Sequence, residues 1–323
     1  MWKKISAIVI PTLLAGAIIV FMLWRVWNDL MLTIEHMIPL YLGAAVLVCI
    51  AAWILRGGRY RFILGALGIP ETLGFSTACI FISQTANLIV PARLGDLVRV
   101  FILRHHDQTP YSRGVSSLVV ERFFDIVMVA ILGAISLPFA LRVPDWFITL
   151  IIIPLAAGAV FVLVLVLLGR VRSERRWVAI LLGMLGEVRE ASLRLRSLAI
   201  LALSSLLIWW VDVMVCVMVV LMFNEPVDLA LITLAIVVGN LVKAVPITPG
   251  GVGTYEISVA LTLEIGGIAP AAATLIAVVD HLIKNLVTLA GGGVSFACFG
   301  EWAVDAVKTA FHSKFDEGEH GGD

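Results

Sequence analysis

Two long apolar stretches of this chain are interrupted by proline and glycine, and the same short pattern follows each interruption. Pro-Ala-Arg-Leu-Gly at 91–95 precedes Val-Val-Glu-Arg at 119–122, whose glutamate lies thirty residues after the proline. Pro-Gly-Gly-Val-Gly at 249–253 precedes Val-Val-Asp-His at 278–281, whose aspartate lies thirty-one residues after its proline. Hydrophobic segments broken at corresponding places in two halves of a membrane protein indicate a transport site.

The composition places the chain in a lipid bilayer. Hydrophobic residues make up 61% of the chain, charged residues only 14%, and the mean hydropathy is +1.05, values outside the range of soluble globular proteins. A net charge of zero gives no general attraction to nucleic acid. The four cysteines lie in separate apolar segments without metal-ligand spacing, so we expect buried packing rather than disulfides, and no metal or cofactor.

Six apolar runs have the ~20 residues that a helix needs to cross the hydrocarbon core. The first run follows two lysines, as in a signal peptide, but it is long and ends without a small-residue cleavage site, so an uncleaved helix is expected. The expected crossings are 5–24, 37–55, 115–141, 146–169, 198–223 and 270–299, and the interrupted stretches are 72–103 and 229–265.

The basic residues orient these segments. If both interrupted stretches enter the bilayer, turn and leave on the side from which they came, sixteen of the 23 Lys and Arg residues fall on one face, together with both termini. Only Arg25 and Arg142 fall on the opposite face. Such an excess marks the cytoplasmic face, and it places Arg56, Arg59 and Arg61 in a cytoplasmic loop. The first hairpin then enters from the cytoplasm and the second from outside.

The predicted fold class is an all-α polytopic membrane protein with about six full transmembrane helices plus two re-entrant helical hairpins in an inverted repeat. Residues 1–311 are expected to form a single integral membrane domain, with repeat 1 at about 72–141 and repeat 2 at about 229–299. Residues 177–197 have the amphipathic pattern of an interfacial helix, although a cytoplasmic linker helix fits equally. The acidic tail, 312–323, is expected to be disordered.

Charged side chains inside the repeats are the candidate substrate-binding residues. One charge in the middle of a lipid-facing helix costs about 2.5–3.5 kcal/mol even on a lenient insertion scale, so these groups must face inward and largely compensate one another. Two interpretations stay open: an internal salt-bridge network, or a site whose cations bind phosphate, which suits the planar guanidinium of arginine. The residues are Arg93, Asp96, Arg99, Glu121, Arg122, Asp125, Lys243, Glu256, Asp280 and Lys284.

The second interruption adds backbone groups to this candidate site. Gly250, Gly251 and Gly253 leave peptide N–H groups unobstructed just before a half-helix expected to start at Thr254, whose N-terminus favours an anion. The same glycines fit a tight turn or a close helix contact equally well. Glu256, in the first turn, is also placed to compensate the helix dipole.

Three motifs together resemble a known family. Asn-Leu-Ile-Val-Pro-Ala-Arg-Leu-Gly-Asp-Leu-Val-Arg at 87–99, Val-Val-Glu-Arg-Phe-Phe-Asp at 119–125 and Pro-Gly-Gly-Val-Gly-Thr-Tyr-Glu at 249–256 are similar to the lysylphosphatidylglycerol synthase transmembrane region family, or flippase-like domain proteins. The resemblance extends over about residues 5–300. The family's motif positions fall here on Pro91, Arg93, Gly95, Asp96, Arg99, Glu121, Arg122, Asp125, Pro249, Gly250, Gly251, Gly253, Glu256 and Asp280.

The resemblance implies a domain that moves lipids between membrane leaflets. The best-known members flip an aminoacylated phosphatidylglycerol that an attached cytosolic synthase domain makes. Since the sequence ends near residue 323 without such a domain, a stand-alone member is expected, and the lysyl-lipid substrate does not follow. Other stand-alone relatives are associated with polyprenyl-linked sugars, hopanoids or other envelope lipids.

The leading functional hypothesis is a flippase or scramblase for an anionic or phosphate-bearing lipid. No P-loop pattern occurs, so ATP is not expected to drive transport directly, and Asp212 or His281 is a candidate for proton coupling, although His281 fits a hydrogen-bonded core residue equally. A secondary transporter of a small soluble anion and an intramembrane lipid-phosphate enzyme are the alternatives. Because no nucleophile motif or metal-ligand spacing is present, we expect that the chain is not an enzyme.

The expected partners are membrane lipids, namely an anionic phospholipid, a polyprenyl phosphate or another envelope lipid. A homo-oligomer and a separate lipid-modifying enzyme are further candidates, and no nucleic acid is expected. The expected location is the prokaryotic cell (inner or plasma) membrane, as a multi-pass protein with cytoplasmic N- and C-termini.

Overall fold

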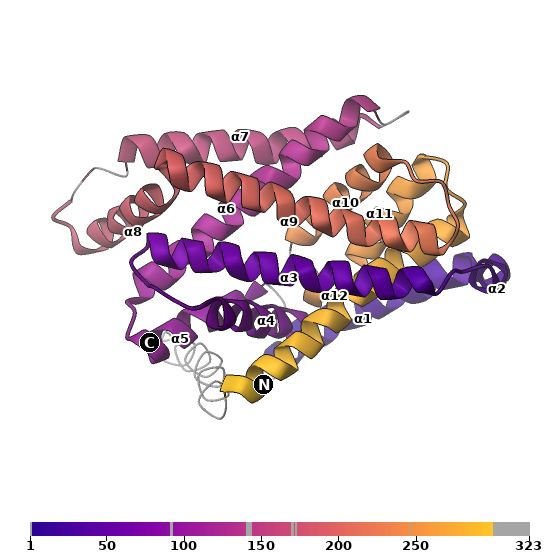
Figure 1. The fold of residues 1–323 in the computed structure, drawn as a ribbon, viewed down its shortest axis with the longest axis horizontal. Coiled ribbons are helices and arrows are strands. Elements are labelled where there is room, and N and C mark those ends of the chain that lie inside the picture. The colour runs from indigo at the N-terminus through magenta and orange to yellow at the C-terminus, as the bar shows by residue number, and fades with distance from the viewer. Residues whose placement is uncertain are drawn as a thin grey trace.

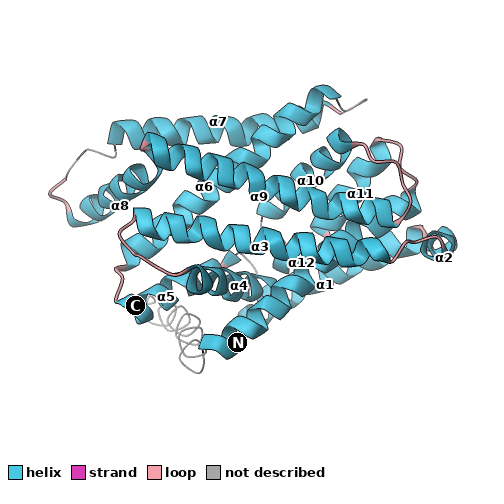
Figure 2. Cartoon of the chain, viewed as in Figure 1, coloured by secondary structure: helices cyan, strands magenta, loops and turns pink. Residues whose placement is uncertain are grey.

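The computed structural model describes residues 2–90, 93–139, 144–168, 171, 173–245 and 247–299, with the backbone alone for 2–9 and 176. This part of the chain consists of α-helices joined by turns and short 3-10 helices, and it contains no strand (Figures 1 and 2). The break residues Pro91 and Pro246 and the tail 312–323 lie outside the described residues.

Each of the six predicted crossings corresponds to a long helix. Of the described helices, α3, α7, α9 and α12 are by themselves long and apolar enough to cross a membrane, and α6 has 26 residues but carries charges in its middle. An all-α polytopic membrane protein is thereby confirmed. The six helices are α1 (Trp2–Arg25), α3 (Leu40–Ala66), α6 (Tyr111–Ser136), α7 (Asp145–Leu168), α9 (Leu195–Met222) and α12 (Pro270–Phe299).

Two further helices lie outside the crossings. α2 (Trp27–Glu35), which the sequence pattern did not predict, is bent by 77° from the preceding segment Ile10–Arg25. α8 (Arg176–Leu193) coincides with the helix predicted at 177–197 and packs against α6, α7 and α9.

Both interrupted stretches fold back on themselves. The first forms α4 (Leu73–Ile89) and α5 (Asp96–Asp107), and the second forms α10 (Leu229–Ala244), the 3-10 turn η3 (Pro249–Gly251) and α11 (Thr254–Ile265). At 1.5 Å per residue these helices are about 18–26 Å long, shorter than the ~30 Å hydrocarbon core. α4 packs against α5, and α10 packs against α11, so each pair forms a hairpin and does not run straight across.

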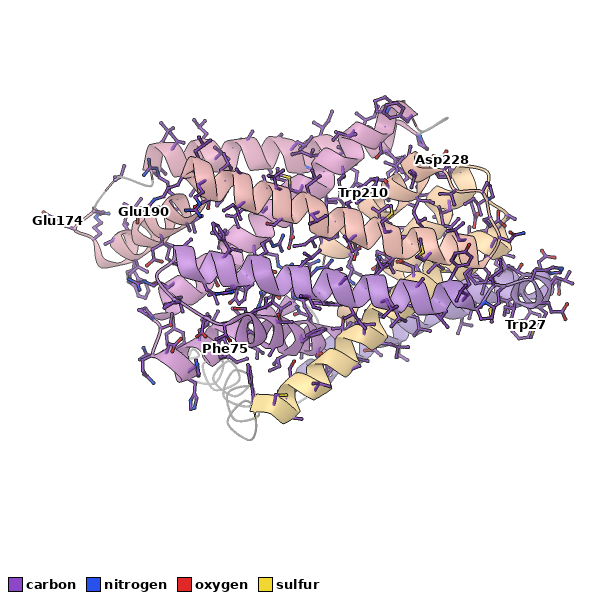
Figure 3. The ribbon with its side chains drawn as sticks, viewed as in Figure 1. Trp27, Phe75, Glu174, Glu190, Trp210 and Asp228 are labelled. Atoms are coloured by element: carbon purple, nitrogen blue, oxygen red, sulfur yellow. The ribbon has the colours of Figure 1, made fainter. Side chains whose placement is uncertain are left out.

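The two hairpins open at opposite ends of α3. Before α3, Ile38 donates its N–H to the carbonyl of Met222 at the end of α9, at 2.7 Å, and α10 starts shortly after that residue. In α3, Arg61 Nε donates to the carbonyl of Glu71 just before α4, at 3.0 Å. The predicted inverted arrangement is therefore present. Figure 3 labels Trp27 and Asp228 at one end of the molecule and Glu174 and Glu190 at the other.

The tips of the two hairpins touch. A Cβ atom on Gly250 would lie 2.7 Å from Leu88 Cδ2 of α4, and one on Gly251 would lie 2.5 Å from Lys243 Cγ of α10. Gly250 and Gly251 have φ values of 62° and 76°, which glycine adopts without strain. Arg93, at the first tip, donates from Nη2 to the carbonyl of Lys243 at 3.3 Å. A tight turn with close contact is thus one role of these glycines.

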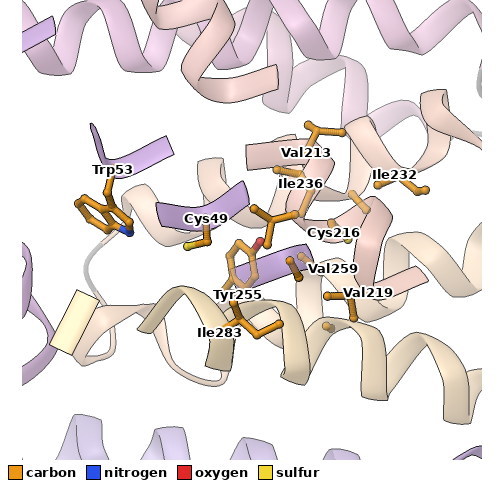
Figure 4. Close-up of a cluster of buried hydrophobic side chains, with 14 of the residues drawn as sticks. Cys49, Trp53, Val213, Cys216, Val219, Ile232, Ile236, Tyr255, Val259 and Ile283 are labelled. Atoms are coloured by element: carbon orange, nitrogen blue, oxygen red, sulfur yellow. The ribbon is translucent and has the colours of Figure 1, made fainter. Parts of the chain in front are cut away.

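Apolar side chains pack around the inner half-helix α11. Tyr255 and Val259 of α11 belong to one buried cluster with residues of α9 and α10, and Figure 4 shows the Tyr255 ring among them. All four cysteines are free thiols; Cys49, Cys79 and Cys216 are buried as expected, whereas Cys298 is exposed.

The close approach at the second tip gives a direct test. Gly253 has a φ of 84°, and a Cβ there would lie 3.1 Å from the carbonyl oxygen of Ala15 in α1. We expect Gly253→Ala to lower the thermal unfolding midpoint of the detergent-solubilised protein, because the left-handed conformation costs a non-glycine residue about 1–3 kcal/mol.

The matched control is Gly293→Ala in α12, where a Cβ would meet nothing within 4 Å. Alanine is favoured over glycine in a helix by about 0.5–1 kcal/mol, so this variant should match or exceed the native midpoint. Equal midpoints for the two variants would contradict the described turn.

Candidate functional site

A cavity of about 150 Å³ lies between the hairpin tips and the long helices α3, α6, α9 and α12. Many polar and charged side chains reach this cavity, although it lies within apolar helices. The polar and charged lining residues include Arg56, Gln84, Asn87, Arg93, Glu121, Arg122, Asp125, Asp212, Asn240, Lys243, His281, Lys284 and Asn285.

In the first repeat, two ion pairs join half-helix α5 to α6. Arg122 Nη2 donates to Asp96 Oδ2 at 2.7 Å, and Arg122 Nε donates to the same oxygen at 3.1 Å. Arg99 is fully buried and donates to Glu121. Asn87 of α4 donates to Asp96 Oδ1 at 2.9 Å. A buried charge is tolerated only when it is paired and hydrogen-bonded, and these contacts meet that condition.

Two arginines of α3 join this network, although the sequence placed them in a cytoplasmic loop. The loop expected at 56–61 is wrong, because α3 continues to Ala66. Arg59, only 3% exposed, donates to Asp125 Oδ1 at 2.6 Å, and Arg56 donates to Asp212 Oδ1 at 3.1 Å. The loop was expected because the apolar run ends at residue 55, whereas burial of these arginines depends on acids of α6 and α9 that are distant in sequence.

In the second repeat, acids of α9 and α12 hold the lysine of α12. Lys284 Nζ lies 3.0 Å from Asp212 Oδ2 and 2.9 Å from Asp280 Oδ2. Tyr255 of α11 donates its hydroxyl to Asp280 Oδ2 at 2.7 Å. The local pairing of Asp280 with Lys284, one helical turn apart, is therefore present.

A second chain of contacts runs from Lys243 through His281 to the start of α11. Lys243 Nζ lies 2.9 Å from His281 Nε2, and His281 Nδ1 lies 2.7 Å from Glu256 Oε1. Because an ammonium group only donates, Nε2 accepts and Nδ1 donates its proton to the carboxylate, which defines a neutral His281. Glu256 Oε2 also accepts the N–H of Gly253 at 2.7 Å. The carboxylate thus occupies the N-terminus of α11 and favours the dipole-compensating interpretation of Glu256 over a free anion site there.

The two repeats share one pattern of contacts. In each, the acid of the Val-Val-acid-base motif binds a side chain of the preceding half-helix, and the basic residue after it binds an acid in the first turn of that half-helix. The pairs are Glu121–Arg99 and Arg122–Asp96 in the first repeat and Asp280–Tyr255 and His281–Glu256 in the second.

Arg93 and Lys243 are the exceptions to this compensation. Among the described residues, neither has a carboxylate oxygen within 4.0 Å, whereas Arg56, Arg122 and Lys284, the other cations lining the cavity, each have one. Arg93 binds the carbonyl of Lys243, and Lys243 binds neutral His281. Where the two tips meet, these two cations are therefore held by neutral acceptors, and among the described residues no carboxylate contacts them directly.

The structure divides the predicted site residues into two groups. Arg93, Glu121, Arg122, Asp125, Lys243, Gly250, Gly251 and Lys284 line the cavity, together with the proton-coupling candidates Asp212 and His281. Four others are buried and bind lining residues without lining the cavity themselves: Asp96, Arg99, Glu256 and Asp280. Gly253 donates its N–H to Glu256 at the start of α11.

Sequence reasoning missed several lining residues. Trp53 and Trp209 lie with their ring centres 5.1 and 5.8 Å from the Arg56 guanidinium carbon, within the range of cation–π contacts. Asn240 precedes Lys243 by one helical turn in α10, a spacing that could have identified it. No local signal places the two tryptophans at the cavity, because tryptophan is common in apolar helices.

The family described as lysylphosphatidylglycerol synthase TM region matches residues 10–292 of this chain. The chain belongs to this family. The sequence-based resemblance is thereby confirmed, and the shared region includes both hairpins and every residue that lines the cavity.

Several curated proteins are similar to this chain. Glycosyltransferase AglD of Haloferax volcanii is 34% identical over 299 residues, which cover 79% of this chain and 48% of that protein. This chain thus spans about half the length of that relative. UPF0104 membrane proteins of Methanocaldococcus jannaschii and Methanothermobacter thermautotrophicus are each 24% identical, covering 65% and 83% of this chain and 92% and 86% of those proteins. No solved structure matches.

The relative with an enzyme name corrects one expectation. We predicted from the missing nucleophile motif that the chain is not an enzyme, and a protein 34% identical to it is named a glycosyltransferase. That prediction is contradicted. The absence of a motif was weak evidence, because a membrane-embedded site assembled from distant helices leaves no compact local pattern.

The buried ion pairs make a stability prediction. Glu121→Gln removes the carboxylate that Arg99, fully buried, contacts most closely, and leaving a buried charge without its partner costs about 3–5 kcal/mol. We expect a clear drop in the thermal unfolding midpoint. The control is Glu190→Gln, whose side chain is 70% exposed and lies 3.8 Å from Arg194; such surface pairs contribute about 0–1 kcal/mol. A comparable drop in both variants would argue against the buried network.

Proposed function

We propose that this chain is a lipid transporter that moves an anionic, phosphate-bearing lipid between the leaflets of the membrane. The observation that carries the proposal is that Arg93 and Lys243, in a cavity between two opposed hairpin tips, contact neutral acceptors and no carboxylate. An unpaired buried cation is costly, so its presence at a polar cavity favours a site that an anion completes.

The lipid phosphate would bind between the two tips while its acyl or prenyl tails stay in the bilayer. The Arg93 guanidinium would offer two parallel donors to the phosphate, and the Lys243 ammonium would add a point charge. The Lys243 carbonyl and His281 now hold these donors, and a phosphate would replace these neutral acceptors with charge-assisted hydrogen bonds. Movement of one repeat against the other would expose the site to each leaflet in turn.

Proton coupling is part of the proposal through the chain Lys243–His281–Glu256. When a phosphate draws the Lys243 ammonium away, His281 Nε2 loses its donor and becomes available to accept a proton, and Glu256 at 2.7 Å would stabilise the imidazolium. Asp212 is the weaker candidate, because it already accepts from both Arg56 and Lys284.

Two names among the comparisons support a phosphate-bearing lipid. The family description contains lysylphosphatidylglycerol, a phospholipid, and one relative is named a glycosyltransferase, an activity that often uses lipid phosphates as sugar carriers. A separate lipid-modifying enzyme that supplies the transported lipid therefore belongs to this proposal.

The enzyme name of that relative also favours a second candidate, glycosyl transfer to a lipid phosphate in the same cavity. The bond between the sugar carbon and the donor's phosphate oxygen would break, with the electron pair leaving on the donor, and a phosphate oxygen of the lipid would form the new bond. The ionised acceptor needs no proton removed. Incubation of purified protein with a nucleotide sugar and a polyprenyl phosphate, followed by mass spectrometry of the lipids, distinguishes this candidate from transport.

Transport is tested in proteoliposomes that carry a fluorescent phosphatidylglycerol. We expect the native protein to expose inner-leaflet label to an impermeant reductant, and Arg93→Gln and Lys243→Gln each to slow this at least about tenfold, because one charge-assisted hydrogen bond contributes about 1.5–3 kcal/mol. Since each replaced cation lacks a carboxylate partner, the thermal unfolding midpoint should stay equal or rise.

The matched control is Arg113→Gln, an arginine 45% exposed that lies 3.8 Å from Glu187 outside the cavity. It should transport at the native rate. Native rates in the Arg93→Gln and Lys243→Gln variants, or no transport by the native protein with any of several anionic lipids, would refute the proposal.

The proposed orientation places both termini and α8 in the cytoplasm and the loop between α9 and α10 outside. In a Cys298→Ser background, we expect a membrane-impermeant maleimide to label Pro226→Cys in intact cells and Glu190→Cys only after permeabilisation, since both positions are exposed. The reverse labelling pattern would contradict the proposed orientation and place α8 outside the cell.

A further inference from the structure

Three potential metal ligands meet at the open end of the first hairpin. Glu71 precedes α4, and His106 and Asp107 form the last two residues of α5. One ligand atom from each residue lies within 4.8 Å of the others. This cluster is separate from the cavity and takes no part in the proposed transport step.

The Glu71 carboxylate is largely buried beside a second carboxylate, that of Asp107. Its side chain is only 7% exposed, and among the described residues its buried Oε1 atom has no hydrogen-bond partner. The neighbouring group on one side is the Asp107 carboxylate, and His106 Nε2 lies at 3.9 Å, beyond hydrogen-bond reach. A cation placed between two facing carboxylates and an imidazole would remove the electrostatic repulsion between the carboxylates.

The backbone and ring of the ligands are already positioned. The Glu71 carbonyl accepts from Arg61 Nε of α3 at 3.0 Å. The His106 ring stacks on Phe75 of α4, with centroids 4.5 Å apart and planes 26° apart, and Figure 3 labels Phe75 at this end of the hairpin. Supporting contacts of this kind orient metal ligands in known sites.

We propose that Glu71, His106 and Asp107 bind a divalent transition-metal ion, of which Zn²⁺ or Mn²⁺ fits best. One imidazole nitrogen and two carboxylate oxygens are a donor set that these ions accept, with water completing the coordination. No metal site was expected from the sequence, because Glu71 lies 35 residues before His106. Glu71 is brought to the other two ligands only when α4 and α5 pack as a hairpin.

The ion would connect the two legs of the hairpin at their open end. Glu71 lies beside the first residue of α4 and Asp107 is the last residue of α5, so one ion would join both ends to α3 through Glu71. Binding would stabilise this end of the hairpin and leave the Arg93 tip, at the opposite end, free to move.

The test uses the full-length protein after removal of its affinity tag, stripped with EDTA, dialysed and titrated with Zn²⁺ alone by isothermal calorimetry. We expect one Zn²⁺ per chain. His106→Ala and Asp107→Asn should each weaken binding at least about tenfold, since changes even in supporting residues cost 10–100-fold. Substitution with Co²⁺ should give a visible absorption spectrum that changes when His106 is removed.

The matched control is His105→Ala, an exposed neighbour outside the cluster, which should bind like the native protein. Because His106 and Asp107 are exposed, these variants should fold, and Glu71→Gln provides a third variant. Absence of Zn²⁺ and Mn²⁺ binding by the native protein, or equal affinities of the His106→Ala and His105→Ala variants, would overturn the proposal. Neither result bears on lipid transport.

Discussion

Compensation of charge inside the bilayer is the constraint on which this structure depends. Lipid offers no partner to an ion or to an open peptide group, so each charged residue in the two repeats must find a partner in a neighbouring helix. The fold meets this requirement twice with the same arrangement, in which a half-helix and the following long helix exchange two side-chain contacts. Arg122–Asp96 and His281–Glu256 are the corresponding pairs. These contacts hold short helices that could not span the membrane, and so maintain the polar cavity at their tips.

Against this compensated background, two cations stand out. Arg93 and Lys243 come from different hairpins and meet at the cavity, where a carbonyl and a neutral imidazole take the place of carboxylates. A site built only for stability would pair them with acids, as it pairs Arg99 with Glu121. We propose that the network and the binding site, which were alternatives at the level of sequence, are inner and outer parts of one arrangement. In this proposal the acids hold most of the cations, and Arg93 and Lys243 bind a phosphate.

Much of this architecture could be predicted from the sequence, because the positive-inside asymmetry and the broken apolar stretches act over whole segments. The six crossings and both hairpins follow from these signals. Apart from the unpredicted helix α2, the errors in the fold concern single residues whose environment depends on distant helices. Arg56 and Arg59 follow the end of an apolar run in the sequence, yet they pair with acids of α9 and α6. Similarly, no local sequence pattern distinguishes Arg93, which has no carboxylate partner among the described residues, from Arg99, which is paired with Glu121.

A cryo-electron microscopy reconstruction of the protein in nanodiscs of anionic phospholipid tests the central claim most directly. The account predicts two hairpins that open on opposite faces, with density for a lipid phosphate between the Arg93 guanidinium and the Lys243 ammonium. It would be contradicted by α4–α5 or α10–α11 running straight through the bilayer. Carboxylates paired with both cations, with phosphate density found elsewhere, would contradict it equally.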